Sequence, residues 1–205
     1  MMWQVVFLRN ALVALLPFQK RLRSLKRGMF GRTHSIHAGS VYSGGFDHIN
    51  LLGEAGMDLN GKTVLEIGTG WYPVIPLMLR LAGASHVVLT DEHRLLDSET
   101  LAAAVAFLKE RREDMATRLE IEVEDVDRVL NIPTGTPLEH KLECLGLSYR
   151  VPTNLGGIEQ RVDAVISHTV LEHIPPDVLT RIFRQTQGVL KEGGLISHGT
   201  DHSDH

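Results

Sequence analysis

Two glycines and two carboxylates are the residues whose types and spacing could do chemistry in this sequence. The segment VLEIGTGWYP places Glu66, Gly68 and Gly70 close together after a β-branched run. Glycine lacks a Cβ, so it permits a tight turn and lets backbone N–H groups approach a ligand closely. Asp91 follows about twenty residues later, where a carboxylate can accept hydrogen bonds from both hydroxyls of a ribose. The pattern indicates a nucleoside site.

The charge near the glycines bears on which nucleoside cofactor would bind. A dinucleotide fingerprint has the form G-x-G-x-x-G, and Pro73 stands at the third glycine position here. Glu66 would bring a negative charge near a pyrophosphate, whereas it could hold the cationic amino group of a methionine moiety. These residues therefore favour S-adenosylmethionine over NAD or NADP.

Strand-like and helix-like stretches alternate beyond residue 60, and this predicts the elements that position the chemistry. Parallel strands need crossover connections, which helices supply, and ligands bind at the carboxyl ends of such strands. We expect a doubly wound, Rossmann-like α/β fold with a mostly parallel sheet and helices on both faces. The expected strands are 63–67, 86–90, 148–151, 162–167 and one starting at 195, and the expected helices are 73–81, 97–113 and 177–190, with short helices within 118–146.

Four segments in order resemble class I S-adenosylmethionine-dependent methyltransferases. E-x-G-x-G at Glu66 to Gly70 is similar to their first motif and Asp91 to their ribose-binding acid. DAVISHTVLEHI at Asp163 to Ile174 looks like the region of their fourth strand, and LKEGGLI at Leu190 to Ile196 like the entry to their fifth. The resemblance covers about two thirds of the chain, and it is specific to the superfamily and to no substrate.

The resemblance implies a role for eight residues in binding the cofactor. Glu66, Gly68, Thr69 and Gly70 would face its methionine part and Asp91 its ribose. Asn154 would reach the adenine, while Ser167 and His168 would line the floor beneath the methionine and sulfonium. Methyl transfer from a sulfonium is an in-line displacement that depends mainly on alignment, so no catalytic residue is assigned.

The resemblance also implies seven strands, of which this sequence reaches only the fifth. We therefore expect residues 46–205 to form a methyltransferase domain lacking its C-terminal strands, with little activity and a tendency to associate through an open edge. Residues 1–45 would form a separate basic and apolar helical segment.

The charge distribution supports that division. Residues 1–46 contain seven Lys or Arg and no Asp or Glu, although the formal net charge of the whole chain is -4. An acidic body argues against a large nucleic-acid footprint. An apolar run over residues 1–19, followed by basic residues, predicts either a helix packed on the domain or a peripheral contact with an anionic membrane.

The cysteine and histidine content bears on disulfides, compartment and metal binding. Cys144 is the only cysteine, which excludes an intrachain disulfide and suits the cytoplasm. His198, His202 and His205 near the end of the sequence indicate a polar tail, and no metal site is expected. The hypothesis is thus a methyltransferase acting on a small molecule or on a glycan or lipid intermediate. An NAD(P)-dependent oxidoreductase and a non-catalytic nucleoside-binding domain are the alternatives.

Overall fold

The structure is a computed structural model that describes residues 34–201. The chain divides into two compact units, Met1–Ser40 and Val41–His205, and the sheet belongs to the second. The apolar run over residues 1–19, the basic cluster that follows it, and His202 and His205 lie outside the described residues.

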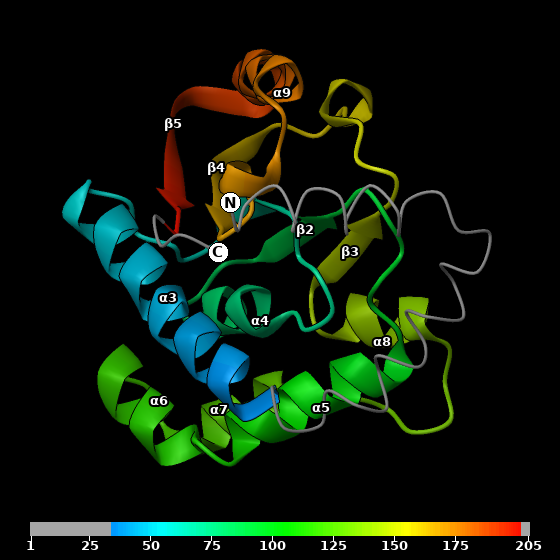
Figure 1. Cartoon of the computed structure of the whole chain (residues 1–205). Helices are drawn as coiled ribbons and strands as arrows, with labels where there is room; N and C mark the ends of the chain where they lie inside the picture. The colour runs from blue at the N-terminus through cyan, green and yellow to red at the C-terminus, as the bar shows by residue number, and fades with distance from the viewer. Residues whose placement is uncertain (1–33, 202–205) are drawn as a thin grey trace, which may run out of the picture. The chain divides into compact units, whose positions relative to one another are not determined.

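A five-stranded parallel sheet forms the centre of the second unit, in the order β3-β2-β1-β4-β5 (Figure 1). From β1 the chain adds β2 and β3 on one side of the sheet and then β4 and β5 on the other. The switch point between β1 and β4 is where ligands bind in such folds. The predicted doubly wound α/β fold is confirmed. The strands are β1 (Thr63–Ile67), β2 (His86–Thr90), β3 (Leu147–Arg150), β4 (Val162–His168) and β5 (Leu190–Gly199).

Helices cover both faces of the sheet, which is why every residue of β1 is buried (Figure 1). Side chains of Val64 and Ile166 lie on the face that packs against α4, while Leu65 and Val165 pack against α9 on the other face. The helices are α3 (His34–Glu54), α4 (Val74–Leu81), α5 (Ser98–Lys109), α6 (Arg112–Leu119), α7 (Val123–Val129), α8 (Leu138–Cys144) and α9 (Pro176–Val189), with 3-10 turns η1 (Leu155–Gly157) and η2 (Leu171–His173).

The helix predicted over 97–113 is divided in the structure. Asp97 caps α5 as expected, since its carboxylate accepts hydrogen bonds from the N–H groups of Glu99 and Thr100. The helix ends at Lys109, and α6 begins at Arg112 after Arg111 leaves the helical conformation. A guanidinium N–H of Arg111 donates to the carbonyl of Phe107 at 2.9 Å, which satisfies a carbonyl at the end of α5.

The predicted boundary between residues 45 and 46 lies inside α3. Gly44 and Gly45 were expected at a change of composition, but they are buried within a continuous helix. A Cβ added at Gly44 would lie 2.1 Å from Cε1 of His168, and one at Gly45 would lie 2.5 Å from the sulfur of Met78. The two glycines therefore allow α3 to pack closely on β4 and α4.

β5 begins earlier than predicted and runs through Gly193 and Gly194. Val162 pairs with Leu190 and Ala164 with Leu195, so the extra residues of β5 form a bulge. Gly193 has φ +72, and a Cβ on Gly194 would lie 2.9 Å from the carbonyl oxygen of Lys191. Among residues 34–201, no helix combines the length and the apolar character needed to cross a membrane.

Candidate functional site

The turn after β1 brings the predicted glycines to the carboxyl end of β2. Gly68 and Gly70 have φ of +79 and +69, a left-handed conformation that favours glycine. The N–H groups of Gly68 and Thr69 donate to the carbonyl of Thr90 at 2.8 and 3.1 Å. A Cβ on Gly68 would lie 2.5 Å from Cγ2 of Val170, so the segment after β4 reaches over this turn.

Asp91 lies against the glycine turn, as the spacing predicts. Its Oδ2 accepts a hydrogen bond from the N–H of Gly70 at 2.9 Å, and its Oδ1 accepts one from the N–H of His93 at 3.2 Å. The backbone N–H of Thr153 donates to the carbonyl of Asp91 at 2.8 Å, which joins the loop after β3 to the same place. Each carboxylate oxygen retains lone pairs that a ribose hydroxyl could use.

Glu66 is a buried carboxyl beneath the turn, with only 4% of its surface exposed. The hydroxyl of Thr69 donates to its Oε2 at 2.5 Å. Burial, opposed by the Thr69 hydrogen bond and aided by the charge of Asp91, raises the pKa of Glu66 to about 7. A cationic ligand next to such a buried carboxyl would stabilise its charged form.

Asn154 is exposed and lies immediately before η1. It lines a cavity of about 570 Å³ together with Ser148 and Arg150 of β3. The hydrogen bond from the neighbouring Thr153 to the carbonyl of Asp91 brings this loop to the carboxyl end of β2. The adenine role of Asn154 stays a prediction.

Ser167 and His168 face opposite sides of the sheet, because consecutive strand residues alternate. Ser167 is fully buried, and a hydrogen bond of 2.8 Å joins its Oγ to Nδ1 of His198 on β5. The ring of His168 packs against Gly44 and lies edge-on to His48, with centroids 5.6 Å apart. The two residues predicted to form one floor thus have different surroundings.

Sequence reasoning missed His48 and Thr169. His48 on α3 is 2% exposed and shares a hydrogen bond of 2.7 Å with Oγ of Ser197 on β5. Thr169 has φ +52, an uncommon conformation for a side-chain-bearing residue, and its N–H donates to the carbonyl of Gly199 at 2.8 Å. No local pattern marks either residue, since His48 and Ser197 are 149 positions apart.

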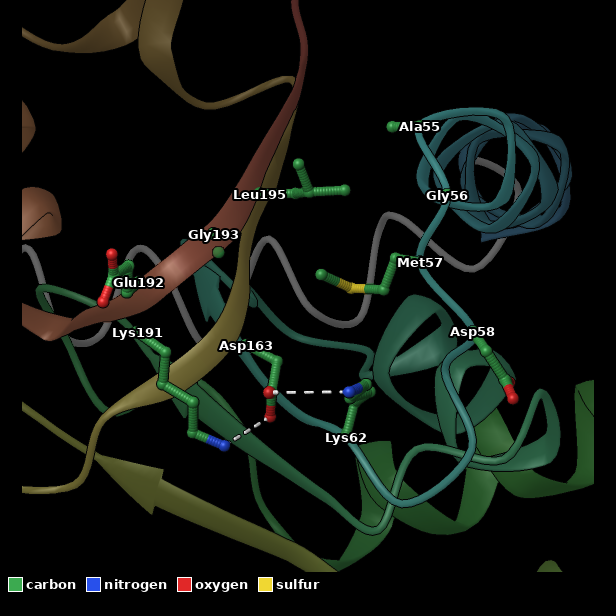
Figure 2. A pocket seen from close by; sticks show the side chains of 11 residues that line it. Ala55, Gly56, Met57, Asp58, Lys62, Asp163, Lys191, Glu192, Gly193 and Leu195 are labelled. Carbon is green, nitrogen blue, oxygen red and sulfur yellow. Dashed lines mark hydrogen bonds and ion pairs between the residues drawn. The ribbon is translucent and has the colours of Figure 1, made fainter.

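A second cavity of about 370 Å³ lies at the opposite end of the strands, where β1 and β4 begin (Figure 2). Asp163 accepts hydrogen bonds from the Thr63 N–H and from the Lys191 ammonium, each at 2.8 Å, and Lys62 lies 4.0 Å away. These contacts hold the pKa of Asp163 below its usual range despite the opposing effect of burial. Asp163 thus joins β1, β4 and β5, and the cavity is remote from the glycine turn.

Side chains that could ligate a metal ion are dispersed in the described part of the chain. Within residues 34–201, no three His, Cys, Asp or Glu side chains are grouped to hold a metal ion. His198 of the polar tail belongs to β5 and contacts Ser167.

Comparison with known proteins gives similarities of fold. No protein-family model matches the sequence, and curated proteins give no significant match. The ribosomal protein L11 methylase of Lactobacillus delbrueckii subsp. bulgaricus is 19% identical, with a TM-score of 0.40 over 74% of this chain and 58% of that one. The DhpI–SAH complex is 16% identical, with a TM-score of 0.47 over 85% and 64%.

A dehydrogenase also matches. (S)-3-hydroxybutyryl-CoA dehydrogenase PaaH1 from Ralstonia eutropha is 17% identical, with a TM-score of 0.36 over 67% of this chain and 40% of that one. The chain therefore spans less than two thirds of the length of each of these proteins. Fold alone does not choose between the two candidate cofactors, so the choice depends on this chain's own residues.

Proposed function

We propose that the glycine turn binds S-adenosylmethionine and that the chain is an S-adenosylmethionine-dependent methyltransferase or its cofactor-binding part. The observation that carries this proposal is the buried carboxyl of Glu66 directly beneath a turn that approaches Asp91. A pyrophosphate at this turn would oppose ionisation of Glu66, whereas an amino acid ammonium would stabilise its charged form. The DhpI–SAH complex is a neighbour of similar fold with such a ligand.

The residues present fit the cofactor in type. Gly68 and Gly70 leave the backbone accessible where a Cβ would intrude, and Asp91 has acceptor capacity for ribose hydroxyls. Glu66 and Thr69 would orient the methionine end, with Ser167 and His168 at the neighbouring strand end and Asn154 toward the base. When bound, the cofactor supplies an electrophilic methyl group on a sulfonium. The protein's contribution is alignment of the acceptor with that methyl.

The acceptor is proposed only by class. A small molecule or a glycan or lipid intermediate suits a chain whose body is acidic and unsuited to nucleic acid. NAD(P)-dependent oxidation is the second candidate function, and a non-catalytic nucleoside-binding domain is the third.

Titration calorimetry with SAH tests the proposed site. Asp91→Ala removes a charged acceptor of two hydroxyl hydrogen bonds, so we expect it to weaken SAH binding by about 1.5 to 3 kcal/mol. Glu92→Ala is the matched control, since Glu92 is an exposed neighbour of the same charge and should leave the affinity unchanged.

Because Asp91 also accepts from Gly70, each variant is checked for folding by its thermal unfolding. Asp91→Asn retains an acceptor for the Gly70 N–H and should still weaken SAH binding. Unchanged SAH affinity in folded Asp91→Ala protein would reject the ribose assignment.

A further inference from the structure

His48 and His168 present two buried ring nitrogens to the same place at the end of β5. Nε2 of His48 and Nδ1 of His168 are both buried without a hydrogen-bond partner among the described residues. A Cβ built on Gly199 would lie 3.7 Å from the first nitrogen and 2.9 Å from the second. Buried polar nitrogens are normally satisfied, so a pair left open indicates a site that takes up a proton or a polar group.

The pair lies beside the proposed cofactor turn. Glu66 of β1 pairs with Ile166 of β4. Two residues further along each strand, Gly68 and His168 stand at corresponding positions. Two residues beyond His168, Val170 contacts the Gly68 position directly. His168 and Glu66 also share one face of the sheet because of strand alternation. The histidine pair is therefore next to the end of β1 that would hold the methionine and sulfonium.

Packing holds the rings in this position. Gly44 of α3 allows Cε1 of His168 to approach the helix, and Ser197 fixes Nδ1 of His48 at 2.7 Å. The rings meet edge to face at an interplanar angle of 78°. Neither histidine is free to turn its open nitrogen to solvent without disturbing α3 or β5.

We propose that the His48–His168 pair takes up the proton that the acceptor loses on methylation, which assigns the acceptor to compounds whose reacting atom is an O–H or N–H. This inference rests on the proposed function. In the step, the bond between sulfur and the methyl carbon breaks and a bond from that carbon to the acceptor atom forms. The electron pair of the acceptor's O–H or N–H bond remains on the acceptor, and the proton goes to an imidazole nitrogen.

The step moves one positive charge from the sulfonium to the imidazole. A sulfonium close by disfavours a protonated imidazole, so the pair is kept neutral and able to accept a proton while the methyl donor is bound. Loss of the methyl leaves a neutral thioether and removes that repulsion. Proton uptake thereby becomes favourable at the point where the acceptor releases a proton.

Other charged groups face the pair from each neighbouring element. Burial lowers the pKa of His48 to about 4, with His168 and His198 adding to the decrease and Asp47 on α3 opposing it. Burial also lowers the pKa of His168, while Asp47 and Glu172 on η2 oppose that decrease. Both carboxylates are exposed.

Histidine ¹⁵N NMR on the whole chain tests this inference without an acceptor. The apparent pKa values of the pair are measured in the SAM complex and in the SAH complex, with His168→Gln used to assign the signals. We expect the apparent pKa of the pair to be lower in the SAM complex than in the SAH complex by at least about one unit, a tenfold change in proton affinity. His86 is the internal control, because it lies at the opposite end of the strands and should titrate equally in both complexes.

Calorimetry provides a second measurement. In a Glu66→Gln background, the ratio of SAM affinity to SAH affinity should fall between pH 7 and pH 5, and adding His168→Gln should hold it constant. The background is needed because the sulfonium of SAM also disfavours protonated Glu66, whose titration would otherwise contribute to the ratio. Equal pKa values in the two complexes would overturn the inference while leaving the proposed function intact, whereas failure of both ligands to bind would reject both.

Discussion

At the scale of single residues, Glu66 is a buried group whose ionisation is linked to folding. It is buried beneath the glycine turn, and among the described residues its side chain accepts one hydrogen bond, from the Thr69 hydroxyl. Its raised pKa means that the folded chain retains a proton that the unfolded chain releases at lower pH. A bound cation would stabilise the charged form of Glu66 and so promote loss of this proton.

This gives a prediction on pH and stability. Stability contributed by protonated Glu66 is present below the unfolded pKa and is lost as pH rises through about 7. Between pH 5 and pH 8 the wild type should therefore lose about 2 to 3 kcal/mol of unfolding free energy relative to Glu66→Gln. Urea unfolding of both proteins at the two pH values measures this difference, and parallel pH profiles would show that Glu66 ionises normally.

The glycines and acids of the site could be predicted because their signal is local. The tight turn needs Gly68 and Gly70, and Asp91 follows one crossover later at the next strand end. The resemblance assigns Ser167 and His168 the same role, so it could not show that the two side chains lie on opposite faces of the sheet. His48 could not be found at all, since a histidine in a helix does not show which distant strand it meets.

At the scale of elements, the strands and crossover helices could be predicted from β-branched runs, caps and glycine stops. The course of α3 could not, because Gly44 and Gly45 are poor helix formers and resembled a boundary. Tertiary packing explains these two glycines, because each leaves room for a side chain of another element. The bulge of β5 was likewise missed, because Gly193 and Gly194 resembled a turn before the strand.

Two glycines of α3 give a matched pair for testing that packing. Gly44→Ala would place a Cβ 2.1 Å from the His168 ring, and overpacking of this kind costs about 1 to 3 kcal/mol of unfolding free energy. Gly53→Ala in the same helix meets nothing within 4 Å and should be neutral or stabilising by up to about 1 kcal/mol. Thermal and urea unfolding compare the two variants, and equal stabilities would contradict the close packing of α3 on β4.

At the scale of the whole molecule, charge divides the chain into a basic beginning and an acidic remainder. Residues 1–33 lie outside the described residues, so their apolar run and basic cluster remain a prediction from sequence. We propose a peripheral contact with an anionic membrane surface for this segment.

Cosedimentation with lipid vesicles measures that contact. Each Lys or Arg near an anionic surface contributes about 1 kcal/mol, so binding to anionic vesicles should be clear at low salt and should fall as salt rises. Vesicles of neutral lipid are the control. Equal sedimentation with both lipids, or none with either, would favour the alternative in which the segment packs on the protein.

Competition binding of SAH, NAD and NADP to the 205-residue chain tests the central claim most directly. The buried carboxyl of Glu66 beneath the glycine turn and the proline in place of a third glycine both favour the methionine-bearing ligand. We predict that SAH binds and that NAD and NADP at much higher concentration do not displace it. Tighter binding of NAD or NADP than of SAH would contradict the account and assign the site to a dinucleotide.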